Sequence, residues 1–143
     1  MRNEKWLSRK FREKCKGSDL EIFNFESAWC LGAPDLYLVN PVVGGFWVEL
    51  KVVNSPQCKI PFRKGQPQWL EANARAGGCA WVLVLSNKEE PGLWLLSSSY
   101  AKSLALLKLR EIPKEMIAGK FHTSSEWGKL KEVLCSRPRP RLP

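Results

Sequence analysis

Several residue types that build common active sites are scarce in this chain of 143 residues. The single histidine, His122, has no serine, cysteine or carboxylate at a spacing typical of a catalytic triad, so we expect a surface or locally bonded histidine. The five cysteines are odd in number, and no CxxC or Cys/His pair of the kind that binds zinc is present. We interpret them as reduced thiols that pack as small apolar side chains.

Long apolar segments are also missing from the sequence. No run is long enough to span a bilayer, and the charged N-terminus shows no signal-peptide pattern. We therefore expect a soluble protein of the cytoplasm, or of the host cytoplasm if a phage encodes it, without a membrane partner.

Acidic residues are few relative to basic ones. The chain has 14 Asp and Glu against 23 Lys and Arg, which gives a net charge of +9 and indicates a polyanionic partner, with nucleic acid as the default. The length and the 44% hydrophobic content predict one domain, over residues 1–135. In the remaining basic tail, 136–143, alternate prolines prevent a helix, and the tail is either an arm that contacts phosphates or a solvated end.

The first predicted element is a helix over residues 4–16, with Asn3 as its cap. Its apolar stripe consists of Leu7, Phe11 and Cys15, and Glu4 projects onto the same line. Two interpretations of Glu4 stay open. It is either a first-turn carboxylate that the helix dipole favours and water reaches, or a side chain that points into a metal site at the edge of the core.

Three predicted strands follow, over residues 20–25, 35–39 and 46–53. The turn residues between the last two predict an antiparallel hairpin, in which Asp35 faces Glu49 across the pair. Strand alternation places Lys51 on the same face as Glu49. Two carboxylates so close would repel each other without a cation, and together they can share one.

The second half alternates helices and strands. The pattern predicts a helix over residues 67–76 and then a buried strand over 80–85, an order that usually makes the strand a parallel neighbour of the strand before the helix. A strand over 93–96 and a helix from Ser97–Ser99 to Arg110 come next. Capping-box spacing from Thr123 to Glu126 predicts a last helix that ends near Cys135.

These motifs resemble those of the PD-(D/E)XK nuclease superfamily. The segments that carry the likeness are Pro34-Asp35, Glu49-Leu50-Lys51 and the downstream Gln66-Pro67-Gln68-Trp69-Leu70. Within the superfamily the chain looks most like VRR-NUC enzymes and the Holliday junction resolvases of archaea and phages, over about residues 4 to 85. The resemblance implies an α/β fold with a restriction-endonuclease-like core, a mixed β-sheet flanked by helices.

The resemblance also assigns roles to individual residues. It implies that Asp35 and Glu49 bind one or two Mg²⁺ or Mn²⁺ ions, together with the Leu50 carbonyl, and that Lys51 lies near the attacking water. Mg²⁺ is a hard cation that takes oxygen ligands and keeps several waters, so two carboxylates suffice.

Two further positions in the family pattern are less constrained. Gln66 would order the water or a phosphate oxygen, with Gln68 as the substitute. Glu4 is our preferred first acidic ligand, and Glu21 and Glu26 lie close enough in sequence to compete.

Small size leaves no room for a domain that reads sequence, so we expect recognition by backbone geometry and charge. The residues expected to contact the DNA backbone are Arg9, Lys10, Lys59, Arg63 and Lys64. A resolvase of this kind acts as a homodimer, since two symmetric cuts need two sites. Apolar residues of the C-terminal half that could form the dimer surface, with core packing as the competing use, are Trp94, Leu95, Leu96 and Trp127.

The leading hypothesis is a metal-dependent endonuclease for branched DNA, a Holliday junction resolvase of recombination and repair. One alternative is a general, flap or nicking nuclease of phage replication or repair. Another is a nucleic-acid-binding module without catalysis, and a purely structural alternative is a surface salt bridge among Asp35, Glu49 and Lys51.

Overall fold

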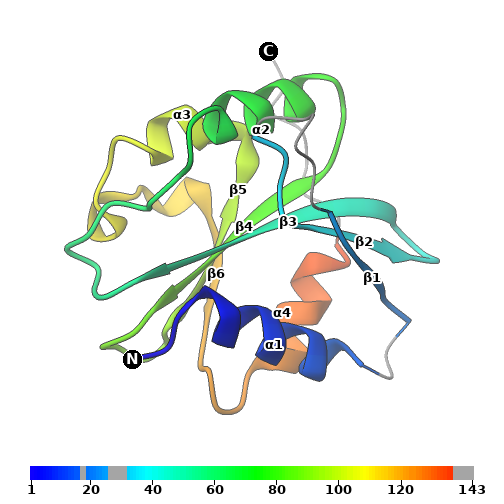
Figure 1. Ribbon diagram of the computed structural model, residues 1–143, viewed down its shortest axis with the longest axis horizontal. Coiled ribbons are helices and arrows are strands. Elements are labelled where there is room, and N and C mark those ends of the chain that lie inside the picture. The colour runs from blue at the N-terminus through cyan, green and yellow to red at the C-terminus, as the bar shows by residue number, and fades with distance from the viewer. Residues whose placement is uncertain (17–18, 26–31, 137–143) are drawn as a thin grey trace.

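The computed structural model describes residues 1–16, 19–25 and 32–136. A six-stranded mixed sheet runs through it in the order β1-β2-β3-β4-β5-β6. In Figure 1, α1 and α4 lie below the sheet and α2 and α3 lie above it. The expected mixed sheet with flanking helices is therefore confirmed. The predictions for the tail beyond Ser136 lie outside the described residues, as does Glu26.

The first helix, α1, spans Glu4–Cys15, as predicted. It begins where it does because the Asn3 side chain accepts a 2.9 Å hydrogen bond from the Trp6 backbone N–H. The predicted stripe of Leu7, Phe11 and Cys15 is at most 1% exposed and packs against the sheet. This packing fixes the position of the start of α1 against the strands that carry the candidate site.

The predicted hairpin is present and extends to a third strand. Strands β1 (Glu21–Asn24), β2 (Leu36–Asn40) and β3 (Gly44–Val53) pair antiparallel in turn. Asn40 closes the β2–β3 turn, because its side-chain oxygen accepts hydrogen bonds of 2.8 and 3.3 Å from the next two free N–H groups, at residues 42 and 43. Leu36 pairs with Val48, so the register places Asp35 opposite Glu49.

The parallel neighbour predicted for the hairpin is also confirmed. Helix α2 (Gln66–Arg75) connects β3 to β4 (Ala80–Ser86), and β4 runs parallel to β3. Strand β5 (Leu93–Ser97) pairs antiparallel with β4. Every residue of β4 is buried, because helices cover both faces of the sheet there.

The helix predicted from the serines at 97–99 to Arg110 is wrong. Only short turns form there, namely a 3₁₀ turn at Ser98–Tyr100, α3 at Ala101–Leu104 and a 3₁₀ turn at Leu109–Glu111. The chain leaves the helix because the N–H groups of Leu109 and Arg110 donate 2.9 Å hydrogen bonds to the Cys58 and Pro56 carbonyls. A contact distant in sequence thus replaces the local helix.

The end of the chain contains one strand that the sequence pattern did not predict. Strand β6 (Ile117–Phe121) pairs antiparallel with β5, after a 3₁₀ turn at Lys114–Met116. The last helix, α4, spans Trp127–Leu134, close to the prediction. Thr123 does not cap it, however, because its hydroxyl donates to Glu90.

Two apolar cores lie on opposite faces of the sheet, and β3 alternates between them. Phe46, Val48 and Leu50 belong to the core between the sheet and helices α1 and α4. Val53 belongs to the core between the sheet and helices α2 and α3. The four residues considered for a dimer surface are at most 4% exposed and belong to these cores; they are Trp94, Leu95, Leu96 and Trp127. Across the described ranges, no helix combines the length and apolarity needed to cross a membrane.

Candidate active site

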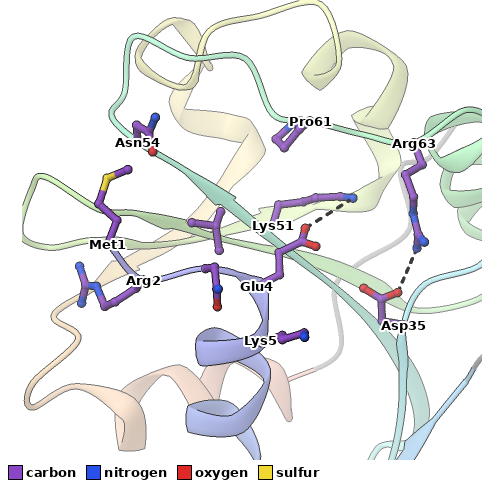
Figure 2. Close-up of a pocket in the computed structure, with 11 residues that line it drawn as sticks. Met1, Arg2, Glu4, Lys5, Asp35, Lys51, Asn54, Pro61 and Arg63 are labelled. Carbon is purple, nitrogen blue, oxygen red and sulfur yellow. Dashed lines mark hydrogen bonds and ion pairs between the residues drawn. The ribbon is translucent and has the colours of Figure 1, made fainter.

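The candidate site lies where β2 begins, beside the middle of β3 and the first turns of α1 and α2. Asp35 immediately precedes β2, and Glu49 and Lys51 are two residues apart on β3. Gln66 is the first residue of α2, and Glu4 is the first of α1. Figure 2 shows the side chains of Glu4, Lys51, Asp35 and Arg63 around one surface pocket. The fold therefore gathers residues that are as much as 62 positions apart (66 − 4).

Glu49 is the most deeply buried carboxylate of this group, with only 1% of its side chain exposed. Gln66 is 1% exposed, and its Nε2 donates a 2.7 Å hydrogen bond to Glu49 Oε2. The Gln66 Oε1 accepts a 2.7 Å hydrogen bond from the Arg63 backbone N–H, which fixes the amide nitrogen toward Glu49. Gln68, the substitute considered for this position, is exposed.

A close approach between two backbones brings Asp35 and Gln66 together. Gly32 has a φ of +89°, and a Cβ at this position would lie 2.3 Å from the Gly65 carbonyl oxygen. Only glycine fits both the backbone conformation and the contact. The segment that leads into β2 therefore packs directly on the turn that leads into α2.

Asp35 is paired with a cation supplied by that same turn. Arg63 Nη2 donates a 3.0 Å hydrogen bond to Asp35 Oδ1. The Asp35 side chain is 43% exposed and that of Arg63 is 65% exposed, so water reaches both. An exposed pair of this kind is weak and can exchange for another partner.

Lys51 lies between two carboxylates from different elements. Its Nζ is 3.8 Å from Glu49 Oε1 and 3.9 Å from Glu4 Oε1, and its side chain is 3% exposed. Both distances are longer than a direct hydrogen bond, so charge attraction rather than directed bonding holds the ammonium group here. The Phe62 ring also lies near the ammonium group, with its centroid 6.0 Å from Nζ.

Glu4 reaches the site from the start of α1, with a side chain that is 56% exposed. Arg2 and Asn87 hold this start, since Asn87 Nδ2 donates to the Arg2 carbonyl at 2.8 Å and Arg2 Nε donates to Asn87 Oδ1 at 3.2 Å. Of the two competitors, Glu21 pairs with Val39 at the end of β1 that lies farther from Asp35. Glu26 lies outside the described residues.

Burial and neighbouring charge strongly perturb Glu49. Its pKa is raised from 4.5 to about 9, mainly because burial penalises the charged form, and also because Asp35 faces it closely enough to share a proton. The Lys51 ammonium opposes this shift, and the negative charge of Asp35 adds to it. The two carboxyl groups therefore lie close enough for a proton or a cation between them to relieve their repulsion.

The donor set fits a hard divalent cation. Within the described part of the chain, no hydrogen-bond donor reaches the buried Glu49 Oε1, so this atom is available to a ligand. Asp35, Glu49 and the carbonyl of Leu50 would supply oxygen ligands, the type that Mg²⁺ and Mn²⁺ prefer. Residues 1–16, 19–25 and 32–136 contain no group of three or more His, Cys, Asp or Glu arranged to hold a metal. A cation at this site would therefore be held by two carboxylates, main-chain oxygen and solvent or substrate.

Two adjoining surface pockets give access to these residues. A pocket of about 810 Å³ is lined by Glu4, Asp35, Lys51 and Arg63 (Figure 2). A second pocket, of about 370 Å³, shares Glu4 and Asp35 and is also lined by Leu50. A polyanionic chain therefore has an open route to the Asp35 side of the site.

The basic residues expected to contact DNA fall into two groups. Arg63 and Lys64 are exposed beside the site, on the turn before α2. Lys59 and Arg9 are exposed farther away, and Lys10 lies 3.7 Å from Glu13 on α1.

The prediction missed Lys5 and Arg12, which line the smaller pocket together with Asp35. Seven Lys and Arg among the first sixteen residues were the available signal for these two positions.

Comparison with known proteins identifies a fold but no sequence family. No protein-family model and no curated protein sequence matches the chain. Among solved structures, the chain is similar to Hjc, a Holliday junction resolvase from the archaeal hyperthermophile Archaeoglobus fulgidus, with 14% identity and a TM-score of 0.51. The match covers 89% of this chain and 96% of that chain. The restriction-endonuclease-like fold implied by the sequence motifs is thereby confirmed.

Proposed function

We propose that this protein is a metal-dependent endonuclease that hydrolyses phosphodiester bonds in DNA. The observation that carries the proposal is the buried Glu49, which faces Asp35, accepts a hydrogen bond from Gln66 and lies 3.8 Å from the Lys51 ammonium group. Burying a carboxylate oxygen without a hydrogen-bond donor costs stability. A surface salt bridge does not require such burial, whereas a metal site does use a buried oxygen ligand.

The metal would be held by Asp35, Glu49 and the Leu50 carbonyl, as one or two Mg²⁺ or Mn²⁺ ions. When bound, a divalent cation supplies Lewis-acid catalysis, because it activates a water and offsets negative charge on the phosphate. Glu4 would contribute through Lys51 or through solvent, since its carboxylate lies 3.9 Å from the ammonium group and its side chain is 56% exposed.

The chain's own residues perform the remaining tasks. Lys51 is almost fully buried between two carboxylates, and its ammonium group stabilises negative charge that develops on the phosphate. Gln66 holds Glu49 in one orientation, because both ends of its amide are bonded. Arg63 reaches the edge of the site and binds a phosphate oxygen after it releases Asp35.

The proposed substrate is branched DNA, most specifically a four-way junction cut by a homodimer. The net charge of +9 supports recognition through the phosphate backbone, and the similar fold of a Holliday junction resolvase supports the branched substrate. Nicking of flaps, forks or linear duplex by a monomer is the competing outcome.

A cleavage panel tests this proposal. Purified protein with Mg²⁺ is incubated with a four-way junction, a flap, a fork, linear duplex and single strand, and its mass is measured in solution. Paired symmetric cuts in the junction by a dimer are expected. Uniform cutting of linear duplex by a monomer would overturn the junction assignment, and absence of cutting from every substrate with Mg²⁺ or Mn²⁺ would overturn the nuclease.

A further inference from the structure

An aromatic row crosses the sheet beside the candidate site. Phe23 pairs with Tyr37, and Tyr37 pairs with Trp47, so the three side chains lie next to one another on one face of β1, β2 and β3. Phe25 extends the row, with its ring edge-on to Trp47 at a centroid distance of 5.0 Å. Trp69 of α2 is the last member of the row, and its ring centroid lies 5.3 Å from that of Trp47.

Two rings of this row are exposed and the other three are half-buried, with Trp47 and Trp69 packed against the core on the α2 and α3 side of the sheet. Phe23 is 53% exposed and Phe25 is 38% exposed. In contrast, Trp81, Trp94 and Trp127 are at most 4% exposed. In Figure 1, α2 and α3 lie over the part of the sheet around β3 to β5, whereas β1 and β2 extend beyond them. The open end of the sheet therefore presents aromatic surface to solvent.

The row is continuous with the carboxylates. Tyr37 lies two residues after Asp35, and Trp47 lies two residues before Glu49, so each ring is the next side chain on the same face of its strand, a separation of about 7 Å. A strand of DNA bound across the carboxylates would reach the rings within about two nucleotides, at about 3.4 Å each. The backbone N–H of Phe25 also donates a 2.8 Å hydrogen bond to the Asp35 carbonyl, which ties the row directly to the site.

The net charge of +9 favours a polyanion as the partner of the row. Phe25 lines the pocket of about 370 Å³ that also contains the basic Lys5 and Arg12 together with the acidic Glu4 and Asp35. A nucleic acid brings phosphates to the cations and bases to the rings.

We propose that the aromatic row stacks on unpaired bases of the DNA strand that enters the site, next to the phosphodiester to be cut. This inference rests on the proposed nuclease function, and it adds a reason for preferring branched or partly single-stranded DNA. Every base offers a flat face to an aromatic ring, so the row recognises unpaired structure without reading sequence. In a fully paired duplex the same faces are stacked on one another and are not available.

The test measures binding by fluorescence anisotropy in EDTA, so that no cutting is required. Two labelled DNAs are compared, a duplex with a short single-stranded tail and the same duplex with an abasic tail of equal length and charge. Wild type is expected to bind the tail with bases at least about fivefold more tightly. Equal affinity for the two tails would overturn the inference.

Variants at Phe25 separate stacking from simple apolar contact. Phe25→Ala and Phe25→Leu should both lose the preference, because leucine keeps apolar bulk without a π-face, whereas Phe25→Tyr should retain it. Leu106→Ala removes an apolar side chain that is 72% exposed elsewhere and should leave the preference unchanged. Retained preference in Phe25→Leu would contradict stacking.

The remaining outcomes distinguish this inference from the proposed function. If Phe25→Ala converts a dimer to a monomer in light scattering and leaves the tail preference unchanged, the row is a protein interface and the inference fails. If wild type prefers the tail with bases yet cuts no DNA with Mg²⁺ or Mn²⁺, the nuclease proposal fails and the stacking surface stands. If cutting is normal and the tails bind equally, only the stacking surface fails.

Discussion

Gln66 donates a 2.7 Å hydrogen bond to Glu49, and both side chains are buried beneath the surface of the candidate site. The pair joins the first turn of α2 to the middle of β3 and leaves one oxygen of Glu49 facing Lys51 at 3.8 Å. A carboxylate held in this way has one orientation, which a metal ligand requires.

Gln66→Met should therefore reduce turnover by about tenfold or more, because it removes the amide that orients Glu49 and keeps a side chain of similar size. Loss of a hydrogen bond to a charged group costs about 1.5–3 kcal/mol, which sets this scale. Steady-state cleavage kinetics measure the effect, with exposed Gln68→Met as the matched control. A Gln66→Met enzyme with wild-type turnover would show that the amide has no part in the reaction.

The metal-free protein should lose stability as pH rises. The pKa of Glu49 is raised from 4.5 to about 9 by folding, chiefly through burial, so the folded state binds this proton more tightly than the unfolded state does. The stabilisation is fully present below the unfolded pKa and is lost as pH rises through this window, by an amount on the order of a few kcal/mol. Glu49→Gln keeps a neutral side chain and should not show this loss.

Thermal unfolding in EDTA at several pH values tests the titration. The difference in Tm between Glu49→Gln and wild type should grow in favour of the variant as pH increases. Glu13→Gln alters an exposed carboxylate on α1 and should track wild type throughout. Parallel curves for Glu49→Gln and wild type would mean that Glu49 is ionised in the metal-free protein.

Gly32→Ala should destabilise the protein more than Gly77→Ala does. Both glycines have a similar positive φ, +89° and +87°, so both substitutions carry a similar backbone penalty of about 1–2 kcal/mol. A Cβ at Gly32 also meets the Gly65 carbonyl oxygen at 2.3 Å, whereas nothing lies within 4 Å of a Cβ at Gly77. Equal losses of Tm in the two variants would refute the close approach that joins Asp35 to Gln66.

Arg63→Gln should strengthen metal binding and weaken DNA binding. In the structure, Arg63 Nη2 lies 3.0 Å from Asp35 Oδ1. A metal cation must therefore displace Arg63 or share the Asp35 carboxylate with it. We expect Arg63→Gln to bind Mn²⁺ several-fold more tightly in calorimetry. We also expect its DNA affinity to depend less steeply on salt concentration, by the equivalent of about one phosphate contact. The control is Arg75→Gln, since Arg75 is 66% exposed against 65% for Arg63 and pairs with Glu71 on α2. Weaker Mn²⁺ binding by Arg63→Gln would exclude the competition.

The site-forming half of the fold was predictable because local signals there agree with the tertiary structure. Asn40 sets the turn, alternation on β3 places Glu49 with Lys51, and pairing with β2 brings Asp35 opposite Glu49. The buried run at Ala80–Ser86 follows a helix, an order that already indicates a parallel strand.

The second half was less predictable because distant contacts override local preference. Serines before an apolar stretch favour a helix, yet the N–H groups of Leu109 and Arg110 bond to the loop after β3. Strand β6 is short and exposed at alternate positions, and it forms because it can pair with the free edge of β5. The hydrogen bonds of Gln66 and the accessibility of the aromatic row likewise depend on tertiary packing that no sequence pattern shows.

The central claim is that Asp35 and Glu49 support metal-dependent cleavage, and one paired measurement tests it most directly. Cleavage of a labelled four-way junction with Mg²⁺ is measured for wild type, Asp35→Asn and Glu49→Gln, and binding of the same junction is measured in Ca²⁺. We predict a loss of cleavage rate of at least about a hundredfold in each variant, with affinity within about twofold of wild type. Undiminished cutting by both variants would contradict the account.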